Sequence, residues 1–172
     1  MIDLAPPVSL GPDRPMRLRA SAAVRRLVRE TRLHPADLVL PLFVKAGQGL
    51  RDEIASMPGV FQLSVDEAVR EAERAAEVGV SGVLLFGLPE HKDAEGSAAH
   101  DDREAVQRAT RAIKAALPDL AVITDVCLCE YTDHGHCGIL GLDGRVELEA
   151  SLPAHVAAAV SHARAGADLV AP

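Results

Sequence analysis

The residues best suited to chemistry are three cysteines that fall within eleven positions. Cys127, Cys129 and Cys137 are the only cysteines of the chain and have the spacing C-x-C-x₇-C, inside the stretch DVCLCEYTDHGHC. A thiolate is a soft ligand that selects zinc over magnesium or calcium. Three protein ligands leave the fourth tetrahedral position of zinc free for water or a substrate atom. The spacing therefore favours a metal site of the catalytic type.

Spacing alone leaves three other interpretations of the cysteines open. His134 or His136 could supply a fourth ligand and close a structural zinc site. The thiols could be redox-active, or they could be small buried side chains. Alternation along a strand would put Cys127 and Cys129 on one face, and the glycine-containing loop after them would bring Cys137 back. A disulfide between Cys127 and Cys129 would be strained.

The composition is that of a globular protein with an aliphatic core. Hydrophobic residues make up 48% of the 172 residues and charged residues 25%, whereas aromatic residues account for only 2%. No apolar run approaches the ~20 residues of a membrane span, and the N-terminus lacks the pattern of a secretory signal. Three cysteines cannot all pair within one chain. These features predict a cytoplasmic protein with reduced thiols and no membrane partner.

Charge divides the chain into a basic segment and an acidic body. Residues 1–34 carry seven arginines against three acidic residues, a net charge of +4, and the remainder carries −11 of a total of −7. A basic segment could bind nucleic acid, but no aromatic residues accompany the arginines. We expect an N-terminal arm over residues 1–36 that docks on an acidic surface of a sister subunit. Residues 37–172 form the body.

Strand and helix signals alternate through the body. Apolar runs predict strands at 38–44, 82–86, 121–128 and 168–172. Helical periodicity covers 64–79, which has a capping box of Ser64 and Glu67 and a terminating Gly79, and also 102–117 and 151–166. The links from helix to strand are short, whereas the links from strand to helix (45–63, 87–101 and 129–150) are long and polar.

This asymmetry is typical of a (β/α)₈ TIM barrel, whose active site lies at the carboxyl ends of its strands. A doubly wound α/β sheet is the alternative, but no Gly-x-Gly-x-x-Gly follows any predicted strand. A barrel takes about 250 residues, and four β-α units are half of one. We therefore expect an incomplete barrel, the N-terminal half of a protein that continues past Pro172.

The segment ITDVCLCEYTDHGHCG resembles the metal-binding signature of the porphobilinogen synthase (5-aminolevulinate dehydratase) family, in its zinc-dependent, cysteine-rich form. The segments RRLVRETRLHPADLVLPLFV, SMPGV, VQRATRAIKAALPDL and AGADLVAP resemble the same family in the same order. The resemblance covers the chain after its first dozen residues. Glu130 and Asp133 depart from the pattern, where proline and serine or threonine are common.

The resemblance implies a TIM-barrel lyase of haem and tetrapyrrole biosynthesis that condenses two molecules of 5-aminolevulinate to porphobilinogen with loss of two waters. It implies a homo-oligomer, typically an octamer, and it admits Mg²⁺ at an additional site. By motif, Cys127, Cys129 and Cys137 are the Zn²⁺ ligands, and Asp125 assists proton transfer or amine binding. Tyr131, His134 and His136 shape the loop around the ligands.

The family also forms imines between its substrates and two lysines. This chain contains Lys45, Lys92 and Lys114, and none of them matches the family's lysine motifs. Lys114 is expected on a solvated helix face. We expect the catalytic lysines beyond Pro172 and an inactive isolated chain. The alternative functions are a non-catalytic zinc-binding or interaction fragment and a thiol redox switch.

Overall fold

The computed structural model describes residues 15–172 and divides the chain into two units, Met1–His34 and Pro35–Pro172. Residues 1–14 of the expected arm, with Arg14, lie outside the described residues. The first unit contains helix α1 (Pro15–Leu18) and helix α2 (Ala22–Val28). The side chain of Ser21 caps α2 by accepting the backbone N–H of Val24 (3.2 Å). No residue of α2 is buried.

The second unit alternates strands and helices. In chain order its elements are η1 (Pro35–Asp37), β1 (Val39–Lys45), β2 (Arg51–Glu53), β3 (Phe61–Ser64), α3 (Val65–Glu77), β4 (Gly82–Leu88), η2 (Ser97–His100), α4 (Ala105–Ala116), β5 (Ala121–Asp125), η3 (Leu128–Glu130), α5 (Leu148–Ala165) and β6 (Leu169–Ala171). The four predicted strands and three predicted helices of the body are all present, with shifted ends. The α/β class is therefore confirmed.

The six strands form one sheet in the order β2-β3-β1-β4-β5-β6. The strands β1, β4, β5 and β6 pair in parallel in this order, with Val39 opposite Gly82, Gly82 opposite Ala121, and Ile123 opposite Leu169, whereas β3 and β2 lie on the other side of β1. From β1 through β4 and β5 to β6, the order in the sheet follows the order in the chain. A doubly wound sheet binds nucleotides where its strand order reverses, next to a Gly-x-Gly-x-x-Gly loop. Here the order changes side at β1, which lies between β3 and β4, but no Gly-x-Gly-x-x-Gly follows β1 or β4.

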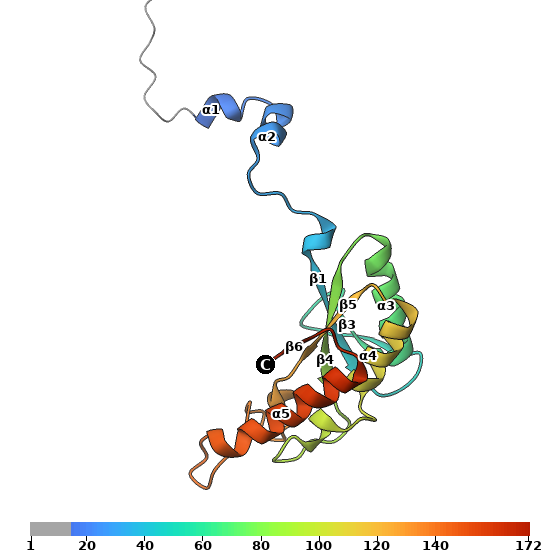
Figure 1. Ribbon diagram of the computed structural model, residues 1–172, viewed down its shortest axis with the longest axis vertical. Coiled ribbons are helices and arrows are strands. Elements are labelled where there is room, and N and C mark those ends of the chain that lie inside the picture. Colours follow the sequence, from blue (N-terminus) through green and yellow to red (C-terminus); the bar gives the residue numbers. More distant parts are fainter. Residues whose placement is uncertain (1–14) are drawn as a thin grey trace, which may run out of the picture. The chain divides into compact units, whose positions relative to one another are not determined.

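The helices α3 and α4 pack side by side against one face of the sheet (Figure 1). Buried side chains alternate along the strands on that face: Leu42, Val44, Val83, Leu85 and Val122. The alternate positions point to the other face and are only half-buried, including Leu84 and Ile123. Phe43 and Phe86 stack there, with ring centroids 5.3 Å apart. One sheet face is therefore a closed core and the other is a less covered apolar surface.

The structure corrects several predicted boundaries. The loop predicted over 45–63 contains β2, antiparallel to β3, and β3 itself pairs in parallel with β1. The capping box is wrong, because the hydroxyl of Ser64 donates to Asp66 (2.6 Å) and its backbone N–H donates to Leu50. The third strand ends at Asp125 rather than at Leu128. The strand stops there because the amide of Cys127 donates to the Asp125 carboxylate instead of a neighbouring strand.

Helix α5 begins three residues earlier than predicted, so Ser151 lies inside it. The Ser151 hydroxyl donates to the Glu147 carbonyl and accepts the backbone N–H of Ile139. The helix ends as predicted at Gly166, which has a φ of 104°. Among residues 15–172 no helix has the length and apolar character needed to cross a membrane.

Candidate metal centre

The loop that carries the cysteines begins where strand β5 stops. The last ladder bond runs from the backbone N–H of Val126 to the carbonyl of Ala171 (3.1 Å). The next free amide, that of Cys127, donates to the Asp125 carboxylate (3.1 Å), which turns the chain out of the sheet and into η3. Leu128, which is fully buried, anchors this turn. The cysteines thus sit at the carboxyl end of a parallel strand, but not on the strand as predicted.

The three thiols converge. The sulfur atoms of Cys127 and Cys129 are 3.1 Å apart, and the sulfur atoms of all three cysteines lie within 4.8 Å of one another. Four tetrahedral sulfur ligands at about 2.3 Å from zinc lie about 3.8 Å from one another. The sulfur–sulfur distances of this triad, from 3.1 Å up to 4.8 Å, include that value. Cys127 and Cys129 are half-buried and Cys137 is exposed. The donor set and its spacing fit one soft metal ion with an open face.

Burial keeps the thiols of Cys127 and Cys129 protonated when no cation is near. It raises the pKa of Cys127 to about 12 and also raises the pKa of Cys129. A redox-active thiol needs a lowered pKa. The surroundings therefore favour the metal-binding interpretation over the redox one, because a bound cation stabilises the thiolates directly.

Two carboxyl groups flank the triad. Asp125 points to the less covered sheet face, and burial raises its pKa. Glu130 accepts the backbone N–H of Gly87 (2.9 Å), which ties the cysteine loop to the end of β4. Burial raises the pKa of Glu130 to about 7, and the charge of Asp125 adds to the shift. The sequence marked Glu130 only as a departure from a family pattern and did not indicate this contact.

The remaining motif residues hold the loop. Tyr131 is buried in a small core with Val126 and Leu128. The His134 ring accepts the backbone N–H of His136 at Nδ1 (3.1 Å) and lies 3.2 Å from the Ala94 carbonyl at Nε2. Because Nδ1 is an acceptor, Nε2 carries the proton and donates. Within residues 15–172 the group of side chains that could hold a metal comprises the three cysteines, without His134 or His136.

One residue near the cysteines carried no signal in the sequence. His155 lies on α5, and its two ring nitrogens are 3.1 Å from the carbonyl oxygen of Val126 and 3.0 Å from that of Cys137. A lone histidine in a helix is not distinctive, so only the folded chain reveals these contacts.

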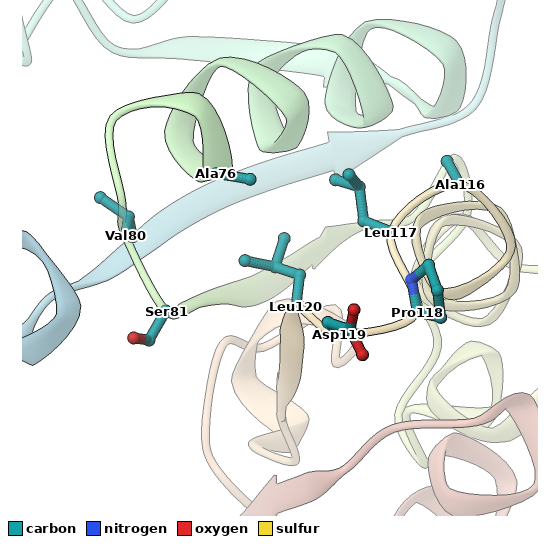
Figure 2. Close-up of a pocket in the computed structure, with 8 residues that line it drawn as sticks. All are labelled: Ala76, Val80, Ser81, Ala116, Leu117, Pro118, Asp119 and Leu120. Atoms are coloured by element: carbon teal, nitrogen blue, oxygen red, sulfur yellow. The ribbon is translucent and has the colours of Figure 1, made fainter.

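A separate cavity of about 320 Å³ lies at the other end of the sheet (Figure 2). Ser81, just before β4, and Leu120, just before β5, border it, together with the ends of α3 and α4. Asp119 is the only charged residue among those lining it. The amino ends of the strands therefore carry a small hollow lined by one carboxylate and no thiol.

Comparisons with known proteins agree with the motif. The family model described as delta-aminolevulinic acid dehydratase matches residues 12–172. The dehydratase of Halalkalibacterium halodurans is 49% identical over 156 residues, 91% of this chain and 47% of that protein. That of Methanothermobacter thermautotrophicus is 52% identical over 158 residues, 91% of this chain and 48% of that protein. The chain thus spans about half the length of these relatives.

A solved structure agrees as well. The Toxoplasma gondii delta-aminolevulinic acid dehydratase (porphobilinogen synthase), crystallised with the reaction product porphobilinogen, superposes with a TM-score of 0.86 at 33% identity. The match covers 92% of this chain and 46% of that one. From the family model, the identities and this superposition together, the chain belongs to the delta-aminolevulinic acid dehydratase family.

Proposed function

We propose that this chain provides the metal-binding half of a zinc-dependent porphobilinogen synthase with a TIM-barrel fold. Such an enzyme condenses two 5-aminolevulinate molecules to porphobilinogen with loss of two waters, in haem biosynthesis. The observation that carries the proposal is the convergence of three thiols at the carboxyl end of β5. The sequential order of the parallel strands β1, β4, β5 and β6 and the helices packed on one face support the barrel.

Cys127, Cys129 and Cys137 would hold the ion through their sulfur atoms. When bound, Zn²⁺ supplies Lewis acidity toward a carbonyl oxygen and a binding position for an amine. Asp125, at the end of the same strand, would hold or accept a proton at its carboxyl group. Burial raises the pKa of Asp125 and so brings the group closer to exchanging protons near neutral pH.

The less covered sheet face is the surface that substrate would meet. Phe43, Phe86 and Ile123 make it apolar, and Asp125 lies at its carboxyl end. An apolar surface beside a few polar groups excludes water and directs a small keto acid toward those groups. Tyr131, His134 and His136 would keep the cysteine loop in place over this surface.

The other properties follow from the same assignment. The arginine-rich arm, residues 1–36, would contact a neighbouring subunit of a homo-oligomer, an octamer in the family's typical form. An additional Mg²⁺ site would belong to that assembly. The protein would act in the cytoplasm, where thiol ligands stay reduced, and neither nucleic acid nor a membrane would be a partner.

A cobalt-substituted chain tests the proposal. Thiolate-bound Co²⁺ has a visible spectrum that reports its coordination. If the site is open, 5-aminolevulinate or porphobilinogen will change the visible bands, because the amine can enter the free position. A closed, structural site will bind one ion and show no change with either compound. That result would favour the alternative, a non-catalytic zinc-binding fragment.

A further inference from the structure

The position of Cys137 depends on contacts outside the turn that holds Cys127 and Cys129. Cys127 and Cys129 are two residues apart, so the turn η3 alone sets their spacing. Cys137 must return across the loop before its sulfur can approach theirs. Ordering a flexible return segment costs conformational entropy, which lowers metal affinity unless the protein has already fixed the segment.

The structure shows where the return segment is held. Residues 138 and 139 dock closely on α5: Ile139 donates its backbone N–H to the Ser151 hydroxyl (2.9 Å), and a Cβ added at Gly138 would come within 2.6 Å of that oxygen. Ser151 and His155 are four residues apart and therefore lie on the same face of the helix. One turn further along the helix, Nε2 of His155 lies 3.0 Å from the carbonyl oxygen of Cys137.

The His155 ring also reaches the start of the loop. Its Nδ1 lies 3.1 Å from the carbonyl oxygen of Val126, which forms the peptide bond to Cys127. One rigid ring thus spans the two chain segments that carry the first and the last cysteine. Both ring nitrogens face carbonyl oxygens, which only accept hydrogen bonds. A ring with one N–H therefore donates to one of these carbonyls and lies against the other. Among the described residues, the side chains that could hold a metal do not include His155.

We infer that His155 is a positioning residue that fixes Cys137 beside Cys127 and Cys129 before the metal arrives. This inference rests on the proposed metal site and deepens it. Residues that orient metal ligands change metal affinity by about 10- to 100-fold when they are mutated. The same loss is expected here, because without the ring the return segment must be ordered during binding.

The first experiment measures Zn²⁺ affinity by competition with a chromophoric chelator. His155→Leu is expected to bind about 10- to 100-fold more weakly than the wild type, and His155→Gln, which keeps one donor, should fall between them. His91→Leu is the matched control, because His91 is an exposed loop histidine. Unchanged affinity in a folded His155→Leu chain would overturn the inference.

A double-mutant cycle separates positioning from a general effect on folding. In a Cys137→Ala background the return segment carries no ligand, so His155→Leu should cost little further affinity. An equal cost in both backgrounds would contradict the positioning role.

A second readout needs no metal. A short bifunctional alkylating reagent, which loses one halide to each thiol that it alkylates, should join Cys127 to Cys137 in the metal-free Cys129→Ala chain, and His155→Leu should lower the yield several-fold. An unchanged yield would overturn the inference. If the cross-link depends on His155 while the wild-type chain binds no zinc, the positioning role stands and the proposed function fails.

Discussion

The hydroxyl of Tyr131 lies directly against the Cα atom of Gly87, at the end of strand β4. A Cβ at position 87 would overlap the tyrosine hydroxyl and would come within 2.9 Å of Val106 on the other side. The same glycine donates its backbone N–H to Glu130. Gly87 therefore permits the cysteine loop to pack on β4.

Gly87→Ala should destabilise the chain by about 1–3 kcal/mol, the usual cost of overpacking a core position. Urea unfolding measures this loss. Adding Tyr131→Phe to the alanine variant removes the clashing hydroxyl, so it should recover part of the lost stability. If the double variant is no more stable than Gly87→Ala, the contact is not the cause.

Zinc affinity should rise with pH. The ligands bind as thiolates, yet burial raises the pKa of Cys127 to about 12 and that of Cys129 above its usual value. Both are protonated in the metal-free chain at neutral pH, so zinc must displace their protons. Each displaced proton adds about tenfold in affinity per pH unit. Calorimetry in buffers of different ionisation enthalpy counts the protons.

The same measurement tests the ligand set. Each of the single variants Cys127→Ala, Cys129→Ala and Cys137→Ala should bind zinc much more weakly than the wild type, with a residual affinity that can still be measured, whereas His136→Ala should keep the wild-type affinity. A pH-independent affinity, or a cysteine variant that still binds one zinc tightly, would contradict three-thiolate binding.

The isolated chain should form no imine with 5-aminolevulinate. A nucleophilic lysine must present a free amine, but the Lys45 ammonium pairs with Asp52 and that of Lys114 pairs with Asp168 (3.0 Å). Lys114 also donates to the Pro118 and Leu120 carbonyls, so it is not on a freely solvated face as predicted. Mass spectrometry after borohydride reduction should find no adduct. An adduct on any of the three lysines, or porphobilinogen formation, would refute this.

The sequence predicted the order of elements because its apolar periods are strong, but it could not predict contacts that depend on pairing. The residues of β2, Arg-Asp-Glu, have no strand pattern and become a strand only by pairing with β3. The third strand ends early because the backbone N–H of Cys127 donates to the Asp125 carboxylate. This local side-chain hydrogen bond replaces the ladder bond that would have extended the strand.

For the site, the convergence of the thiols follows from the cysteine spacing and the glycine-containing return loop. What holds the loop does not, because His155 reaches carbonyls 29 and 18 residues away along the chain. Contacts to backbone atoms leave no pattern of residue types. The convergence of the three thiols was therefore predictable from the sequence, and the contacts that support the loop were not.

Glu130 should make the metal-free chain less stable as the pH rises. Its folded pKa, about 7, lies above the value of 4.5 for an exposed glutamate. Between these values the folded state binds the proton and the unfolded state does not, so stability falls as pH rises from about 4.5 to 7. Glu130→Gln keeps an acceptor for Gly87 and should remove this slope in urea unfolding. A slope that survives the substitution would exclude Glu130 as its source.

His162 should make the chain less stable as the pH falls, the opposite of the effect of Glu130. The ring is fully buried, and burial lowers its pKa from 6.5, partly opposed by the nearby Ala99 carbonyl. As pH falls through 6.5 the unfolded chain takes up a proton that the folded chain refuses, so stability is lost on acidification until the folded pKa is reached. Comparing His162→Leu with His162 in a Glu130→Gln background isolates this loss, and His91→Leu serves as the exposed control. The leucine variant should lose no stability between pH 7 and the folded pKa of His162. Equal losses in both chains would show that His162 binds protons equally in the folded and unfolded states and does not cause the acid sensitivity.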